Sequence, residues 1–159
     1  MNIKEHLNKA YETMQKGDLK SALILYNEVL SADPSNLNAL NSLGFLFYFL
    51  EEYEQGKEVC LKTINLYPNN PYARKGLGLH LARLNCLEEA VQSLKKAIEI
   101  DENFVDAYHD LAFVYFEAGD FDTAKKYLVE GMPKIKDEKY QAYFDKFMKK
   151  LDEINADKK

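Results

Sequence analysis

The sequence predicts an all-α protein built from four helical hairpins and a C-terminal helix. Two observations lead to this prediction. Apolar residues recur at intervals of three and four along most of the 159-residue chain, which is the period of an α-helix. The same pattern of small and apolar residues also returns after every 34 residues, four times and without an insertion. A chain of this length suits one domain, and we expect residues 1–159 to form it.

The repeat is clearest in columns of residues that lie 34 positions apart in the chain. Two of these columns contain only small residues: Ala10, Gly44, Gly78 and Ala112, and then Ala22, Gly56, Ala90 and Ala124. Larger apolar residues form a third column: Leu30, Ile64, Ile98 and Met132. Helices that cross closely need a small side chain at the crossing point. Each small column therefore predicts where the two helices of a hairpin meet.

The columns divide the chain into repeats at about residues 3–36, 37–70, 71–104 and 105–136. Short polar turns separate the two helices of each repeat: KGDL, EEYE, NCLE and AGDF. Between the second and third repeats, Asn70 and Pro71 suit an N-cap followed by proline in the first helical turn. In the fourth repeat, Pro133 is expected to end the second helix near Gly131, because proline cannot donate the next helical hydrogen bond.

A further amphipathic segment follows the fourth repeat, at about residues 137–155. Its apolar residues have helical spacing: Tyr140, Tyr143, Phe144, Phe147, Met148, Leu151 and Ile154. A stack of repeats leaves its last hydrophobic face open, so we expect this segment to be a capping helix. The alternative is that the segment docks onto a second subunit.

Composition excludes several classes of protein. The formal net charge is -5 with both signs interspersed, which argues against nucleic acid as a partner, since phosphate binding requires clustered Lys and Arg. The longest apolar run, residues 43–50, is far shorter than the roughly 18 residues of a membrane-spanning helix, so no membrane insertion is expected. Cys60 and Cys86 lack a Cys-x-x-Cys spacing and favour the reducing cytoplasm.

No catalytic or metal-binding pattern stands out. The three histidines, His6, His80 and His109, lie far apart and match no zinc-binding spacing. Cys60 falls in the column of Tyr26, Leu94 and Leu128, which predicts a buried thiol rather than a nucleophile. We therefore expect no enzyme activity and no cofactor or metal.

The repeat resembles the tetratricopeptide repeat (TPR) family, whose units are 34 residues long. The fourth repeat carries the resemblance through Tyr108, Leu111, Ala112, Tyr115, Gly119, Ala124 and Leu128. The likeness covers about residues 3–136 and implies a right-handed α-solenoid superhelix. In the first repeat, His6, Lys9 and Thr13 stand where the family buries apolar residues, so we expect its first helix to be rotated or loosely packed.

The resemblance also implies a concave groove lined by the first helix of each hairpin, where a partner peptide would lie. The residues expected to line it are Tyr11, Met14, Asn41, Phe45, Tyr48, Phe49, Tyr72, Lys75, Leu79, Arg83, His109, Phe113 and Phe116. Residues 43, 44, 47 and 50 already supply the packing stripe of their helix, so Phe45, Tyr48 and Phe49 are surplus to it. These three either face a guest or pack on the neighbouring hairpin.

The function implied is a protein–protein interaction module, an adaptor, scaffold or co-chaperone-like protein that binds an apolar or aromatic peptide or helix. Charged residues are expected to orient that guest at the rim of the groove: Lys75, Arg83, Asp106 and Asp110. The slots of the family's carboxylate clamp hold unsuitable residues, so a chaperone tail is not expected: Leu7, Tyr11, Ser42, Tyr72 and Gly76. Two alternatives stay open, a structural homo-oligomer (a homodimer through the terminal helices, for example) and a chaperone for hydrophobic segments of a secreted partner.

Overall fold

The structure is a computed structural model that describes residues 2–156, apart from the side chains of Lys139 and Asn155. Residues 1 and 157–159 of the expected domain lie outside the described residues. The described chain contains helices and no strand, as the sequence predicts. Its elements are α1 (Ile3–Gln15), α2 (Leu19–Ala32), α3 (Leu37–Phe49), α4 (Tyr53–Leu66), α5 (Pro71–Arg83), α6 (Leu87–Ile100), α7 (Val105–Glu117), α8 (Phe121–Gly131), the 3-10 turn η1 (Met132–Lys134) and α9 (Glu138–Ala156).

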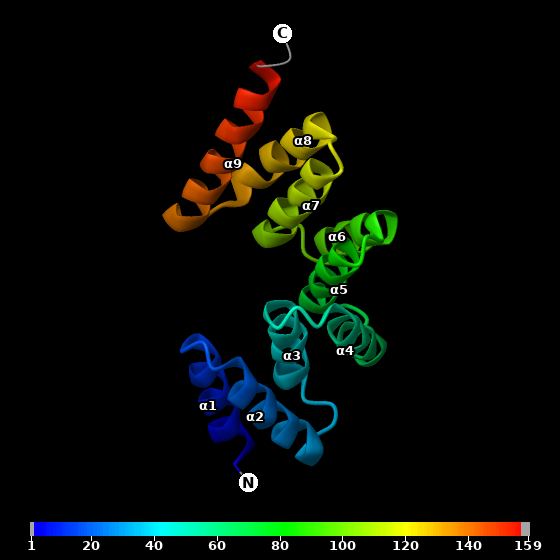
Figure 1. Ribbon diagram of the computed structural model, residues 1–159, viewed down its shortest axis with the longest axis vertical. Helices are drawn as coiled ribbons and strands as arrows, with labels where there is room; N and C mark the ends of the chain where they lie inside the picture. Colours follow the sequence, from blue (N-terminus) through cyan, green and yellow to red (C-terminus); the bar gives the residue numbers. More distant parts are fainter. Residues whose placement is uncertain (1, 157–159) are drawn as a thin grey trace.

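The helices form a stack of antiparallel hairpins, α1/α2, α3/α4, α5/α6 and α7/α8. They follow one another along the longest axis, with the two termini at opposite ends (Figure 1). Each hairpin packs on the next, and the first helices also contact one another in the order α1, α3, α5 and α7. This continuous row of first helices provides the face on which the candidate site lies.

The turn inside each hairpin depends on one residue in the left-handed backbone region. These residues are 34 positions apart, with φ angles of 83° at Gly17, 60° at Glu51, 63° at Asn85 and 79° at Gly119. Glycine and asparagine adopt this region readily, whereas Glu51 does so at a cost. The turn geometry is therefore part of the repeat, even where the residue type changes.

The helix start that was predicted at Asn70 is confirmed. The Asn70 side chain accepts hydrogen bonds from the backbone N–H groups of Tyr72 at 2.9 Å and Ala73 at 3.3 Å, and Pro71 occupies the first turn of α5. Asn36 caps α3 in the same way through the N–H of Ala39, at 3.1 Å. Such caps satisfy backbone donors that have no partner inside the helix.

The small columns lie where neighbouring helices approach most closely. A Cβ added to Gly44 would lie 3.1 Å from the Cys60 sulfur, and one on Gly78 would lie 2.6 Å from Leu94 Cγ. Gly76 lies outside the two columns, and a Cβ there would lie 3.0 Å from the same sulfur. Cys60 itself is buried, as its column predicts. These glycines thus allow α3 and α5 to approach α4 closely, and α5 to approach α6.

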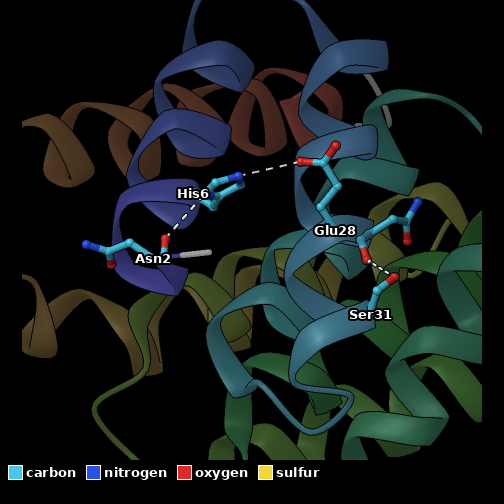
Figure 2. Close-up of polar contacts among 5 residues, drawn as sticks. Asn2, His6, Glu28 and Ser31 are labelled. Carbon is cyan, nitrogen blue, oxygen red and sulfur yellow. Dashed lines mark hydrogen bonds and ion pairs between the residues drawn. The ribbon is translucent and has the colours of Figure 1, made fainter.

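The first hairpin packs in the same register as the others, so its first helix is not rotated; it is loosely packed, as expected, because Ala10 is the one buried residue of α1. Ala10 is fully buried at the crossing of α1 and α2. His6 connects the two helices: its Nδ1 lies 3.2 Å from Asn2 O, and its Nε2 lies 3.7 Å from the Glu28 carboxylate (Figure 2). A polar contact at the surface therefore replaces the apolar contact that is usual in the family.

The C-terminal end of the stack is closed by α9. Helix α8 ends at Gly131 and Pro133 lies in η1, as predicted. Helix α9 then lies beside α7 and α8 (Figure 1), with Phe144 and Leu151 fully buried in the core that these helices share. Across residues 2–156, we find no helix with the length and apolar character needed to cross a membrane.

Candidate functional site: a groove lined by aromatic side chains

The row of first helices carries a concave surface with a cavity of about 690 Å³. Four aromatic side chains on its wall are exposed to solvent: Tyr11 by 55%, Phe45 by 43%, Phe49 by 55% and Tyr72 by 62%. We call this surface the aromatic groove. It also includes Met14, Asn41, Ser42, Lys75 and Asp106 among its lining residues. A soluble domain normally covers rings of this size, so their gathering around one cavity is informative.

The repeat places these rings together. Tyr11 and Phe45 occupy the same position in α1 and α3, and Phe49 lies one helical turn after Phe45. The rings of Phe45 and Phe49 meet edge to face, with centroids 5.5 Å apart. Tyr72 projects from the first turn of α5, and its ring centroid lies 4.9 Å from that of Phe104. The aromatic groove therefore spans three hairpins.

Lys75 lies in the floor of the aromatic groove rather than at its rim. Its residue is 8% exposed, and its Nζ lies 3.5 Å from a carboxylate oxygen of both Asp106 and Asp110. The same ammonium group lies 5.1 Å from the ring centroid of Phe45 and 5.6 Å from that of Phe104. Lys75 is thus held by partners from α3 and α7 and the loop before α7, and it joins the neighbouring hairpins.

Tyr48, Arg83 and Leu79 were also expected in the groove, but they lie outside its cavity. The Tyr48 ring packs edge to face against Tyr53 and His80, with centroids 5.8 and 5.9 Å away. Arg83 Nε donates to the Tyr53 hydroxyl at 3.3 Å, and its guanidinium lies 6.0 Å from the centre of the Tyr48 ring. Leu79 is half-buried. Tyr53 of the same hairpin and His80 of the next one therefore cover Tyr48, whereas Phe45 and Phe49 remain open.

His109, Phe113 and Phe116 of α7 contact α9. The ring centroid of Phe147 lies 5.5 Å from that of His109, 6.4 Å from that of Phe113 and 5.4 Å from that of Phe116. Helix α9 thus takes the place that the first helix of another repeat would have. None of these three side chains lines the aromatic groove, because α9 packs against them.

Asn41 lines the aromatic groove and also joins two successive hairpins. Its Oδ1 accepts a hydrogen bond from Asn70 Nδ2 at 2.9 Å, so it is anchored to the cap of the next hairpin. Phe104 was not predicted as part of the site, although its ring supports both Tyr72 and Lys75. The sequence does hold a signal for it: positions 2, 36 and 70 are all Asn, and Phe104 interrupts this column of N-caps.

The described residues offer no cluster suited to metal binding, and the buried thiol of Cys60 is not a nucleophile. In the part of the chain that the structure describes, no group of three His, Cys, Asp or Glu side chains could hold a metal ion. Burial raises the pKa of the Cys60 thiol to about 12, which leaves it protonated and unreactive at neutral pH.

Comparisons with known proteins agree with this architecture. A TPR repeat model matches residues 78–119, and a tetratricopeptide repeat model matches residues 6–36. The peroxisomal targeting signal receptor of Kluyveromyces lactis is 32% identical over 116 residues, covering 71% of this chain and 20% of that protein. A TPR repeat-containing protein of Methanocaldococcus jannaschii is 27% identical over 128 residues, covering 80% of this chain and 22% of that protein.

A solved structure shows the same fold. A thermophilic TPR protein of Thermus thermophilus superposes with a TM-score of 0.83 at 18% identity, over 94% of this chain and 80% of that chain. The chain spans about a fifth of the length of the curated relatives it matches.

Stacked helical hairpins with an open groove define a helical repeat module of the kind that mediates protein–protein interaction. Together with the repeat matches, they show that the chain belongs to the tetratricopeptide repeat family.

Proposed function

We propose that this chain is a non-catalytic adaptor that holds an apolar or aromatic segment of another protein in the aromatic groove. The observation that carries the proposal is the gathering of Tyr11, Phe45, Phe49 and Tyr72, each about half exposed, around one cavity. Their positions on α1, α3 and α5 allow a single guest segment to contact three hairpins at once.

The size of the exposed apolar surface supports this proposal. An aromatic side chain buries roughly 150–250 Å² when it is fully covered, so four half-exposed rings offer on the order of 300–500 Å². That is about half of one side of a standard protein interface, roughly 800 Å². Aromatic residues are also among those that contribute most to binding energy at interfaces.

The chemistry of the groove also bears on which guest it would accept. Relatives named as peroxisomal targeting signal receptors support peptide capture by this kind of repeat. An acidic chaperone tail is not the proposed guest, because the clamp slots hold the wrong residues: Leu7, Tyr11, Ser42, Tyr72 and Gly76. Cys60 and Cys86 are free cysteines, which supports a cytoplasmic place for this interaction.

A peptide selection tests the proposal. A random peptide library displayed on phage is selected on the purified wild-type protein, and bound peptides are sequenced. We expect enrichment of peptides that contain Phe, Tyr, Trp or Leu. Binding of a selected peptide should weaken about tenfold or more in Phe49→Ala and in Tyr72→Ala, since each removes a central aromatic contact.

A matched control removes an exposed apolar side chain elsewhere. Ile24 on α2 is 60% exposed and lies outside the aromatic groove, so Ile24→Ala should leave peptide binding unchanged. Urea unfolding should show little change in stability for all three variants. Absence of apolar enrichment would refute the proposal. So would light scattering that shows a dimer which dissociates in Phe49→Ala, because the groove would then hold a second copy.

A further inference from the structure

The end of the aromatic groove at α7 carries more carboxylates than permanent cations. Asp106 and Asp110 lie one helical turn apart on α7, and Lys75 contacts both of them at 3.5 Å. His109 Nδ1 lies 3.7 Å from the other oxygen of Asp110, and its charge depends on pH. When this histidine is neutral, two negative charges face one positive charge.

The positive charge is already committed to its partners. Lys75 is buried between the rings of Phe45 and Phe104 as well as between the two carboxylates, so it is not available to a guest. In contrast, the Asp106 side chain is 30% exposed and lines the cavity. The Oδ2 atom of Asp110, buried and ion-paired with Lys75, accepts no hydrogen bond from any described residue. The exposed charge at this end is therefore that of Asp106.

Tyr140 of α9 also faces this end and donates a hydrogen bond to Asp106. Burial, then the negative charge of Asp106 and this hydrogen bond, raise the pKa of the Tyr140 hydroxyl, and the charges of Asp137 and Asp110 add to the shift. A tyrosine that stays protonated adds no charge, so the local balance remains negative. An acidic guest side chain would be repelled here, and a basic one would be attracted.

The repeat register also gives the distance between a guest residue that pairs with Asp106 and one that contacts Tyr72. Asp106 and Tyr72 occupy the same position in successive repeats, on the adjacent helices α7 and α5. Packed helices are about 8–10 Å apart, and an extended chain advances about 3.3 Å per residue. A guest residue that pairs with Asp106 would thus lie about three residues from the one that contacts Tyr72.

Resting on the function proposed above, we propose that the guest segment is an extended peptide that carries a lysine or arginine about three residues from an aromatic or large apolar residue. The basic side chain pairs with Asp106 at the α7 end, and the apolar side chain contacts Tyr72 and Phe45. Lys4 has the register position of Asp106 in the first repeat and lines a second cavity, which shares Tyr11 and Tyr72 with the aromatic groove. The pair of opposite charges gives the bound peptide a direction.

The experiment compares peptide selections on three proteins: wild type, Asp106→Asn and Glu58→Gln. The library encodes random peptides of about 12 residues, which exceeds the roughly seven to nine extended residues that four adjacent helices span. Selection takes place at about pH 8. Glu58 is exposed on α4 and lies outside the groove, so its variant changes net charge equally and serves as the control.

We expect wild type and Glu58→Gln to select peptides with a basic residue at the stated spacing from an aromatic one. Asp106→Asn should select aromatic peptides without that basic residue. For a peptide selected on wild type, Asp106→Asn should weaken binding about three- to tenfold, and the difference should shrink at high salt. Circular dichroism should show that Asp106→Asn folds, since Lys75 keeps Asp110 as a partner.

The outcomes separate this proposal from the function on which it rests. Aromatic enrichment with no basic preference, or with an acidic preference, would overturn the basic guest while leaving the aromatic groove intact. The same would follow if Asp106→Asn and Glu58→Gln selected identical peptides. A selection with no aromatic enrichment at all would overturn both.

Discussion

Gly56 of α4 and His80 of α5 share one small space, so a side chain added to the first should displace the second. A Cβ on Gly56 would lie 2.6 Å from His80 Nδ1 and closer still to Cε1 and Nε2. The imidazole ring is fully buried, and its Nε2 lies 2.8 Å from Gly44 O. The ring cannot move away from Gly56 without losing this contact and disturbing Tyr48 and Tyr53 beside it.

The expected magnitude follows from three contributions. Alanine at a helical glycine position is favoured by about 1 kcal/mol through helix propensity. Overpacking costs about 1–3 kcal/mol, and loss of the buried hydrogen bond costs about 1 kcal/mol more. Gly56→Ala should therefore lower the free energy of unfolding by about 1–3 kcal/mol. In a His80→Ala background the ring is absent, and the same change should raise stability by about 1 kcal/mol.

A double-mutant cycle measures this coupling. Urea unfolding of the wild type, the two single variants and the double variant is followed by circular dichroism at about 222 nm, because the sequence has no tryptophan to serve as a fluorescent probe. The coupling free energy should be about 3 kcal/mol, at the upper end for residues in contact. Equal effects of Gly56→Ala in both backgrounds would refute the reasoning, as would a stabilised Gly56→Ala single variant.

Three further predictions concern the pH dependence of stability, one hairpin turn and the two thiols. Burial lowers the pKa of His80 below 6.5 and outweighs its hydrogen bond to Gly44 O, which acts in the opposite direction. As the pH falls, the unfolded chain therefore binds a proton at this histidine before the folded protein does. The free energy of unfolding should fall from about pH 6.5 downward, by up to roughly 1.4 kcal/mol per pH unit, until His80 is protonated in the folded protein too. Urea titrations at several pH values should show this fall, and His80→Gln should remove it. Glu51→Gly should raise the free energy of unfolding by about 1 kcal/mol, because φ is positive at Glu51, and a melting temperature that does not rise would count against this view. Cys86 should react with a thiol reagent in the folded state while Cys60, whose pKa burial raises to about 12, reacts only on unfolding; equal rates would contradict the buried position of Cys60.

Helix starts, helix ends and the burial of Cys60 were predicted correctly from the sequence, because each depends on nearby residues or on a position in the repeat. The cap at Asn70 and the end of α8 near Gly131 follow from local hydrogen bonding and from the limits on proline. The buried position of Cys60 follows from its place in a repeat column. Leu46 was missed as a core residue although it is fully buried, because α3 is apolar on most sides and its period does not single out one face.

The candidate site was predicted only in part, because exposure depends on what the next hairpin brings. Tyr48 and Phe49 are adjacent on α3 and were expected to share one face. Their positions differ by about 100° around the helix, so His80 and Tyr53 cover the first while the second stays open. In the same way, Phe113 is a groove residue by register but contacts α9 through Phe147.

By itself, the sequence determined the helices, their ends, the hairpin repeat and the family, since each of these is encoded by the spacing of residues within one or two units. The tertiary structure alone decided which of the thirteen expected groove residues remain exposed around the cavity. It buried Lys75 between two rings and two carboxylates, and it left Asp106 as the exposed charge of the groove. The physical reason is that burial and charge balance at a side chain are set by residues about one repeat away, which meet only when the hairpins stack.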